Sequence, residues 1–190
     1  MASQPHHREQ VRQRIFRSAL QLFNRNGFTA ASIDDIMAGA GMTRGGFYSY
    51  FQSKSELYAE AISCFVSGKI EDISSEGKAS DRAAHLLRDY LSSKHFEEVD
   101  TSCALIGLSN DVSRTDQSVR EAQESALKMM IETFERGVAA DSQPARQLAL
   151  ALTSLCVGGM VLARAIENRS LADELRDATM NIAMKLGEWS

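Results

Sequence analysis

Proline is scarce in this sequence: of 190 residues, only Pro5 and Pro144 are prolines. Both lie outside the long apolar patterns, and proline is the residue that most strongly interrupts helices. No segment alternates apolar and polar residues as a half-buried strand would. No internal repeat is visible, and no linker is long enough to detach a separate domain. We therefore expect an all-α protein.

Cysteine is also rare, and the positions of the three cysteines argue against both disulfides and a zinc site. Cys64, Cys103 and Cys156 are widely spaced and odd in number. They match neither a disulfide framework nor a zinc-binding pattern. Reduced thiols in the cytoplasm are the ordinary state for such residues. We expect no metal and no cofactor.

Long hydrophobic runs are missing as well. Residues 148–163 are nearly all apolar, but they lie between Arg146 and Arg164 and fall short of the ~20 residues that a membrane span needs. No apolar stretch follows Met1, so we expect no secretory signal peptide. The sequence favours a cytoplasmic protein with no membrane partner, in which residues 148–163 form a buried or interface helix.

The charge is unevenly distributed along the chain. The formal net charge is −4, which taken alone argues weakly against binding DNA. Up to Tyr58, however, seven basic residues stand against four acidic ones, so the remainder of the chain is clearly acidic. Such asymmetry suits a protein with one end that faces DNA and one end that does not.

The segment 32–51, SIDDIMAGAGMTRGGFYSYF, predicts two short helices joined by a tight turn. Ser32 and Asp35 have the spacing of a capping box, which begins a helix. Gly39 and Gly41 are placed to end that helix, and Thr43 is placed to cap the second one. The apolar residues that share one face of the first helix are Ile33, Ile36, Met37 and Ala40.

Two short helices joined in this way form a helix-turn-helix, whose second helix enters the major groove of DNA. The alternative is an ordinary corner between two helices of a bundle. The second helix would contain Arg44, two glycines and two tyrosines, which make a poor core helix. This composition favours DNA binding.

The helices that flank this motif begin and end at recognisable residues. An amphipathic pattern from Arg8 ends at Asn26-Gly27. Ser53 and Glu56 form a second capping box. Lys54 then lies in the first turn of a helix, where a cation is unfavourable unless the partner is an anion such as phosphate. The alternative is a solvated surface lysine.

Helical patterns continue from Asp81 to Trp189, and the last two are candidates for self-association. Their apolar stripes are broad, and Gly158-Gly159 would let another helix approach closely. Two such helices from each of two chains would form a four-helix interface. The alternative is that both helices complete the monomer core. The predicted interface residues are Leu152, Leu155, Gly158, Gly159, Leu162, Ile166, Leu175, Ala178, Ile182 and Leu186.

The segment from Arg8 to Phe65 resembles the DNA-binding domain of the TetR/AcrR family of bacterial transcriptional regulators. The resemblance lies in GFT at 27–29, SIDDI at 32–36, AGMTRGGFYSYF at 40–51 and SKSEL at 53–57. It implies an N-terminal three-helix DNA-binding domain at 1–52. A larger helical domain at 53–190 would bind an effector and dimerise.

The resemblance also implies how individual residues act. Arg44 would read a base edge, since its forked donors suit guanine, and Gly45 and Gly46 would let the backbone lie deep in the groove. Tyr48 and Tyr50 would bind phosphates, although the family often has histidine at the position of Tyr50. The predicted DNA-binding residues are Ser32, Thr43, Arg44, Gly45, Gly46, Tyr48, Tyr50 and Lys54.

The expected function is that of a dimeric repressor on a palindromic double-stranded operator, released by a small apolar or aromatic effector. Residues of the middle helices would line the effector pocket, although aromatic and Met side chains at helical spacing are more often plain core. The candidates are Phe65, Tyr90, His95, Phe96, Cys103, Ile106, Asn110, Met130 and Phe134.

Three other functions stay open at this point. Cys103 follows Thr101-Ser102, which are suited to capping, and a thiol in a helix's first turn is reactive, so a redox- or electrophile-sensing repressor is one. A thiol enzyme using Cys103 and His95 is another, but no third orienting residue is recognisable. A helical scaffold that binds only protein is the last, and the charge asymmetry argues against it.

Overall fold

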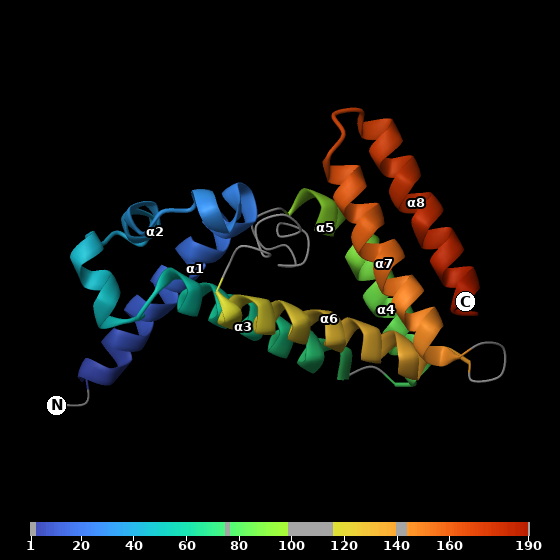
Figure 1. Cartoon of the computed structure of the whole chain (residues 1–190), viewed down its shortest axis with the longest axis horizontal. Coiled ribbons are helices and arrows are strands. Elements are labelled where there is room, and N and C mark those ends of the chain that lie inside the picture. The colour runs from blue at the N-terminus through green and yellow to red at the C-terminus, as the bar shows by residue number, and fades with distance from the viewer. Residues whose placement is uncertain (1–2, 75–76, 99–115, 140–143, 190) are drawn as a thin grey trace. The chain divides into compact units, whose positions relative to one another are not determined.

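The computed structural model of the chain describes residues 3–74, 77–98, 116–139 and 144–189 (Figure 1). Every regular element in those ranges is a helix, which confirms the all-α prediction. In chain order they are α1 (Ser3–Ala30), α2 (Ile33–Gly39), the 3-10 helix η1 (Arg44–Ser49), α3 (Lys54–Ser74), α4 (Ala79–Leu91), α5 (Ser93–Glu97), α6 (Gln117–Gly137), α7 (Ala145–Arg164) and α8 (Arg169–Leu186).

The helices form two compact units. The first unit contains residues 1–65 and 99–123, and the second contains residues 66–98 and 124–190. Because α3 and α6 each contribute to both units, neither division falls at the end of a helix. The predicted domain boundary after residue 52 stays a prediction.

The core of the first unit forms where α1 packs against α2 and the start of α3. The α1 stripe is buried, as its spacing predicts, and α1 breaks at Gly27, whose φ of 77° and ψ of 170° are not helical. Phe23 meets Tyr58 of α3 edge-on, with ring centres 4.6 Å apart. The buried α1 residues are Val11, Ile15, Ala19 and Phe23.

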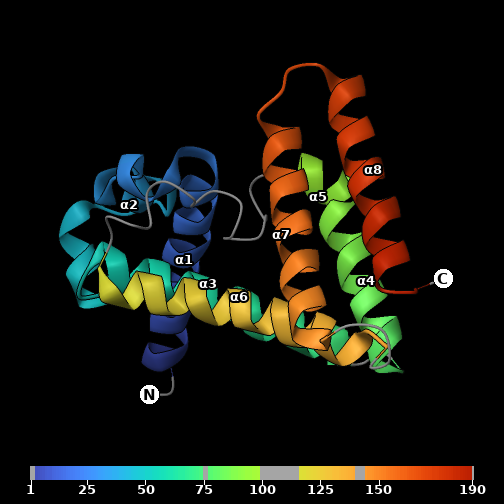
Figure 2. The same ribbon diagram turned by 45° about the vertical axis from the view of Figure 1, so that its right-hand side comes forward.

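In the second unit, α4 packs against the pair formed by α7 and α8. These two helices lie side by side in both ribbon views, next to α4 (Figures 1 and 2). The face of α4 that carries Ala84, Leu87, Tyr90 and Leu91 is buried, in agreement with its helical spacing. Burial of this face against two long helices gives the second unit a core of its own.

The chain does not continue as a helix to Trp189, and this part of the prediction is wrong. Helix α8 ends at Leu186, and Glu188 adopts a positive φ of 55° that turns the chain back. The Trp189 indole N–H donates to the Gly137 carbonyl oxygen at 2.8 Å. Its ring stacks on Phe134, with centres 5.7 Å apart. Burying the indole while satisfying its N–H decides this end of the chain.

Helix α7 has the length and hydropathy to cross a membrane. The 18-residue segment of α7 that meets these criteria has a mean hydropathy of 1.5, and 33% of it is buried within the chain. Length and composition are weak evidence, because helices inside a protein core meet the same criteria. Here α7 packs against α4 and α8. Its partial burial agrees with the prediction of a buried or interface helix.

The adjacent glycines of α7 differ in surroundings, and this difference predicts their stability effects. A Cβ on Gly159 would lie 2.7 Å from Thr179 Oγ1 and 3.1 Å from Thr179 Cβ, whereas one on Gly158 would have nothing within 4 Å. We expect Gly159→Ala to lower the free energy of unfolding by about 1–3 kcal/mol through overpacking. Gly158→Ala should raise it by about 0.5–1 kcal/mol through helix propensity.

Urea unfolding at a single protein concentration measures both variants, since each carries the same added methyl group on the same helix. Equal midpoints, or a higher midpoint for Gly159→Ala, would contradict the close packing of α7 on α8.

Candidate nucleic-acid interface

Helix α2 begins at the capping residues that the sequence predicts. Ser32 is its N-cap, with φ −87° and ψ 154°, and its hydroxyl accepts from the Asp35 backbone N–H at 3.0 Å. The same hydroxyl donates to the Asp35 carboxylate at 2.6 Å. On α1, Ser18 donates to the Ile36 carbonyl oxygen at 2.8 Å. Helix α2 is therefore fixed at its start by its own cap and at its middle by α1.

The turn after α2 depends on Gly41, whose φ of 71° is the left-handed conformation that glycine tolerates best. The next element is the six-residue 3-10 helix η1. Thr43 is its N-cap residue, as predicted, with φ −89° and ψ 152°, but the Thr43 side chain makes no cap hydrogen bond. The Thr43 carbonyl oxygen instead accepts from the Gly46 N–H at 3.0 Å, which starts the tighter helix.

Helix η1 has one buried face and one exposed face. Phe47 is fully buried and contacts Phe51, with ring centres 5.8 Å apart, so both are core residues. Tyr48 on the opposite face is 62% exposed. Gly45 borders open space, whereas Gly46 lies against the side chains of Met37 and Met42.

Arg44 forms an ion pair across the turn with Asp34 of α2. The distance from Arg44 Nη1 to Asp34 Oδ2 is 2.7 Å, and both side chains are more than half exposed. Because the pair is exposed, it contributes only about 0–1 kcal/mol to stability. The spacing of the sequence offers no signal for this contact, since the two residues lie ten positions apart.

Arg8 of α1 also lies beside η1, which the sequence analysis did not predict. Its Nη2 donates to the Ser49 carbonyl oxygen at 2.8 Å, and its guanidinium is 5.8 Å from the centre of the Tyr50 ring. Tyr50 is half-buried. The excess of basic residues near the N-terminus was the only signal available in the sequence.

Lys54 is half-buried, which excludes the alternative of a simple solvated lysine. Its ammonium donates to the carbonyl oxygens of Phe28 at 2.7 Å and Ala31 at 2.9 Å, and it lies 4.4 Å from the centre of the Phe28 ring. Carbonyl oxygens at the end of α1 and just after it thus stabilise the Lys54 ammonium, which the N-terminus of α3 disfavours. The predicted phosphate contact by Lys54 stays a prediction.

The Ser53 half of the second predicted capping box forms just before Lys54, while the Glu56 carboxylate binds one residue earlier than predicted. The Glu56 backbone N–H donates to Ser53 Oγ at 3.0 Å, and the Glu56 carboxylate accepts from the Gln52 N–H. These two hydrogen bonds fix the start of α3 directly after η1.

The described residues of the predicted effector set do not gather around one cavity. Met130 and Phe134 are buried core residues, and Tyr90 is buried on α4. A hollow of about 220 Å³ lies between α4 and the chain end near Trp189, and none of the described candidates lines it. Cys103, Ile106, Asn110 and the side chain of Phe65 lie outside the part of the chain that the structure describes.

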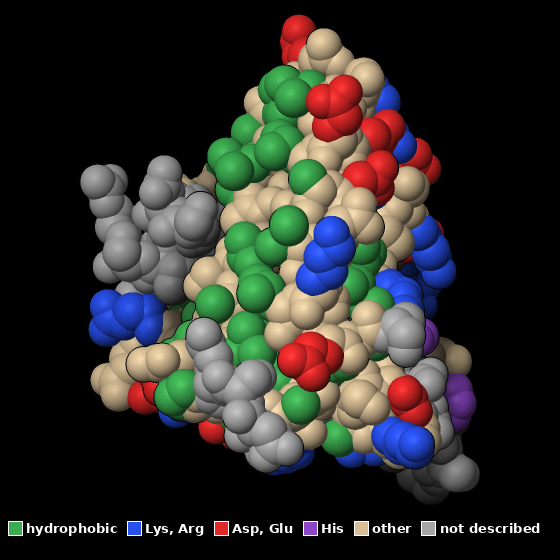
Figure 3. Space-filling model, turned by 90° about the vertical axis from the view of Figure 1, so that its right-hand side faces the viewer, with side chains coloured by type: hydrophobic (Ala, Val, Ile, Leu, Met, Phe, Trp, Pro, Cys, Tyr) green, Lys and Arg blue, Asp and Glu red, His purple; other side chains and the backbone are tan. Residues whose placement is uncertain are grey.

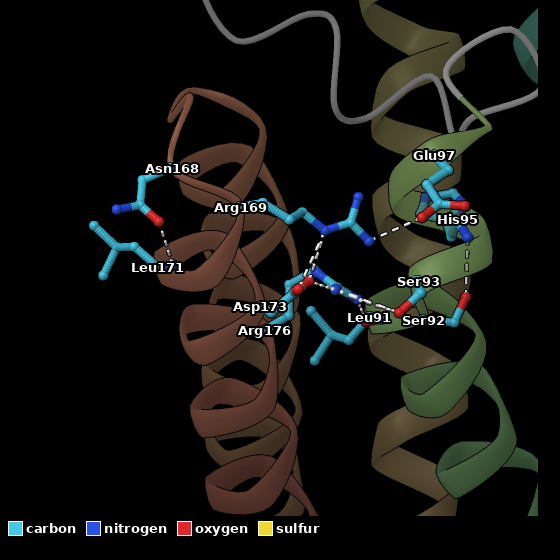
Figure 4. Close-up of polar contacts among 10 residues, drawn as sticks. All are labelled: Leu91, Ser92, Ser93, His95, Glu97, Asn168, Arg169, Leu171, Asp173 and Arg176. Atoms are coloured by element: carbon cyan, nitrogen blue, oxygen red, sulfur yellow. Dashed lines mark hydrogen bonds and ion pairs between the residues drawn. The ribbon is translucent and has the colours of Figure 1, made fainter.

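Phe96 and His95 belong to α5, which is fastened to α8 by arginines (Figure 4). The guanidinium groups of Arg169 and Arg176 lie 4.7 Å and 4.8 Å from the centre of the Phe96 ring. Arg176 is buried and donates to the Leu91 carbonyl oxygen at 2.9 Å. A hydrogen bond from Arg176, aided by Arg169, lowers the pKa of Asp173. Phe96 thus belongs to the contacts that join α5 to α8, as the ring on which two arginines pack.

Hydrophobic side chains gather on the face formed by α7 and α8 (Figure 3). Of the predicted interface residues, Leu155, Leu162, Ile182 and Leu186 are exposed large hydrophobics, and Ala178 is exposed. Gly158 faces open space, and Ile166 and Leu175 are half-buried.

Two of the predicted interface residues, however, do not lie on this face. Leu152 is fully buried, and Gly159 packs against Thr179 of the same chain. These two assignments are wrong, because both residues are buried within a single chain.

The described thiols show no sign of activation. Burial raises the pKa of the Cys156 thiol to about 12. Burial, with the nearby Glu60 carboxylate, also raises the pKa of Cys64. A raised pKa lowers the fraction of reactive thiolate. Within the described ranges, no group of His, Cys, Asp and Glu could hold a metal ion.

Comparison with known proteins agrees with the helix-turn-helix geometry of the first unit. The family model described as bacterial regulatory proteins, tetR family, matches residues 15–61. The chain is 40% identical over 52 residues to the HTH-type transcriptional regulator AcrR of Shigella flexneri, covering 27% of this chain and 24% of AcrR. It is 28% identical over 131 residues to the HTH-type transcriptional repressor DhaR of Mycobacterium sp. (strain GP1), covering 68% and 66%.

The fold likeness extends over nearly the whole chain. The reduced form of E. coli NemR aligns with a TM-score of 0.77 at 20% identity, covering 93% of this chain and 96% of that one. The sequence match to AcrR, by contrast, spans about a quarter of that relative's length. The similarity in sequence is therefore concentrated in the helix-turn-helix unit, while the helical fold is shared much more widely.

An all-helical chain with an N-terminal helix-turn-helix defines the class of helical DNA-binding regulators. The N-terminal unit of this chain belongs to the TetR/AcrR family of bacterial transcriptional regulators. The relatives and solved structures that this chain resembles are named transcriptional regulators, so they give no support to the alternative of a thiol enzyme using Cys103 and His95. The comparisons give no support to redox sensing through Cys103.

The contacts of Lys54 predict that it stabilises the first unit whether or not DNA is bound. Lys54→Ala would leave partly buried carbonyl oxygens without a charged donor, at a cost of about 1–3 kcal/mol in the free energy of unfolding. Lys128→Ala, which breaks an exposed ion pair with Glu124, should cost less than about 0.5 kcal/mol. Urea unfolding without DNA compares the two, and equal midpoints would contradict this role of Lys54.

Proposed function

We propose that the chain is a dimeric, sequence-specific DNA-binding repressor that a small apolar or aromatic effector releases from its operator. One observation carries the DNA-binding part of this proposal. Helix η1 buries Phe47 completely and presents Arg44, Gly45 and Tyr48 to solvent. A short helix anchored on one side and polar on the other suits insertion into the major groove.

Each exposed residue has a role that its chemistry supports. The guanidinium group of Arg44 would donate two hydrogen bonds, to the O6 and N7 atoms of a guanine. Tyr48 would donate to a phosphate, and so would Tyr50 after a modest movement from its half-buried position. The hydroxyls of Ser32 and Thr43 and the ammonium of Lys54 would complete the phosphate contacts, which position the protein without reading sequence.

The exposed hydrophobic residues of α7 and α8 support a homodimer. Leu162 is 57% exposed and Ile182 is 51% exposed. A continuous apolar face of this kind on a protein surface marks an interaction site. Two copies joined there would present two recognition helices to a palindromic operator, with half-sites about 34–36 Å apart.

The proposal of repression and its relief by an effector is supported by similarity to related proteins. DhaR is named a transcriptional repressor. Helix α3 begins beside the DNA-facing residues and continues into the second unit. An effector that shifted α3 would change the spacing of the recognition helices, and it need favour the released state by only a few kcal/mol. Such a regulator would act in the cytoplasm.

Removing the Arg44 side chain tests the DNA-reading role. A random-sequence duplex library, bound by the wild-type protein and sequenced, would first define the preferred site. Arg44→Ala should then lose discrimination at one base pair of each half-site by about 5- to 150-fold. Binding should also weaken steeply as salt rises. No enrichment by the wild-type protein would contradict the proposal, and so would unchanged preferences in Arg44→Ala.

A charge on the α7–α8 face tests the dimer. Leu162→Glu should give a folded monomer in sedimentation velocity, because a desolvated carboxylate at the centre of an apolar interface is costly. Leu127→Glu, at a leucine of α6 that is 37% exposed, should leave the association state unchanged. If Leu162→Glu sediments like the wild-type protein, the proposed interface is wrong.

A further inference from the structure

Asp34 and Arg44 form a contact between the two helices of the helix-turn-helix. Arg44 is the first residue of η1, and Asp34 lies in the first turn of α2. Arg44 Nη1 is 2.7 Å from Asp34 Oδ2, and the two side chains are 61% and 56% exposed. The carboxylate is therefore on the same open surface as the residue proposed to read a base.

The helix dipole favours an acid in the first turn of α2, but the cap of this helix does not use the Asp34 carboxylate. The N-cap of α2 is Ser32, and Asp35 provides the partner of its hydroxyl. Asp34 directs its carboxylate to η1 instead. A carboxylate on a DNA-facing surface repels the phosphates of every sequence alike, so it lowers general affinity for DNA.

The donors of the arginine explain how this acid can still favour the correct sequence. A guanidinium has five N–H donors in a fixed plane. Asp34 occupies a donor at Nη1 and leaves others for the paired contact to guanine. An arginine held in this way loses less rotamer freedom on binding a base than a free one does.

We propose that Asp34 is a specificity-determining positioning residue, which orients Arg44 toward a base and keeps it from binding phosphates of unrelated DNA. This inference rests on the proposed function of Arg44. When the pair is intact, a phosphate must compete with the carboxylate for the guanidinium. A guanine in register binds the donors that the carboxylate leaves open.

The test compares Asp34→Asn with the wild-type protein on two duplexes of equal length and composition. One duplex is the site selected from the random library, and the other is its scrambled version. Fluorescence anisotropy gives both affinities. We expect Asp34→Asn to bind the scrambled duplex about two- to threefold more tightly. The ratio of the two affinities should fall about fivefold.

Glu9→Gln is the matched control, because it removes the same charge from an exposed residue of the same unit that contacts Gln13. It should leave the affinity ratio unchanged. A second selection identifies the base involved: Asp34→Asn should weaken the same base preference that Arg44→Ala abolishes. In an Arg44→Ala background, Asp34→Asn should cause no further loss of preference.

Failure of the inference is distinguishable from failure of the proposed function. If the wild-type protein enriches a site and Asp34→Asn keeps the full affinity ratio, the inference alone is overturned. Equal losses on both duplexes with a lowered Tm would also overturn it, because they indicate a folding role. If the wild-type protein enriches no sequence, the proposed function falls and the inference falls with it.

Discussion

Burial of Phe47 is the interaction on which the DNA-facing part of the molecule depends. Helix η1 has six residues and no side-chain N-cap, and a helix this short is unstable by itself. Complete burial of a phenylalanine supplies about 1.5–3 kcal/mol of stabilisation. The same burial determines which side of η1 faces solvent. The exposed positions of Arg44 and Tyr48 follow from it.

The first unit also places donors from distant residues at carbonyl groups near helix ends, where free carbonyl oxygens gather. Ser18 donates to Ile36, Lys54 to Phe28 and Ala31, and Arg8 to Ser49. Some of the basic residues that make this end of the chain positive are therefore structural as well. Arg44 differs from them, because it pairs with the exposed carboxylate of Asp34 and not with a backbone group.

In the second unit, the inner and outer sides of α7 have separate roles. Gly159 packs against Thr179 of α8 and Leu152 is fully buried, while Leu162 remains exposed. Helical spacing predicts that all three are apolar positions of one broad stripe. It does not divide the stripe, because the division depends on the direction from which α8 approaches. The return of Trp189 onto Phe134 likewise depends on a partner distant in sequence.

Local patterns in the sequence predict most of the helices, the caps at Ser32 and Ser53 and the location of the helix-turn-helix. These features arise from interactions between residues three or four positions apart, as Ser32 with Asp35 and Ser53 with Glu56 illustrate. Tertiary structure alone decided the partners of Lys54, Arg176 and Arg44. Each of these contacts joins separate elements, and the energies of such side-chain contacts depend on burial and direction, which no local spacing encodes.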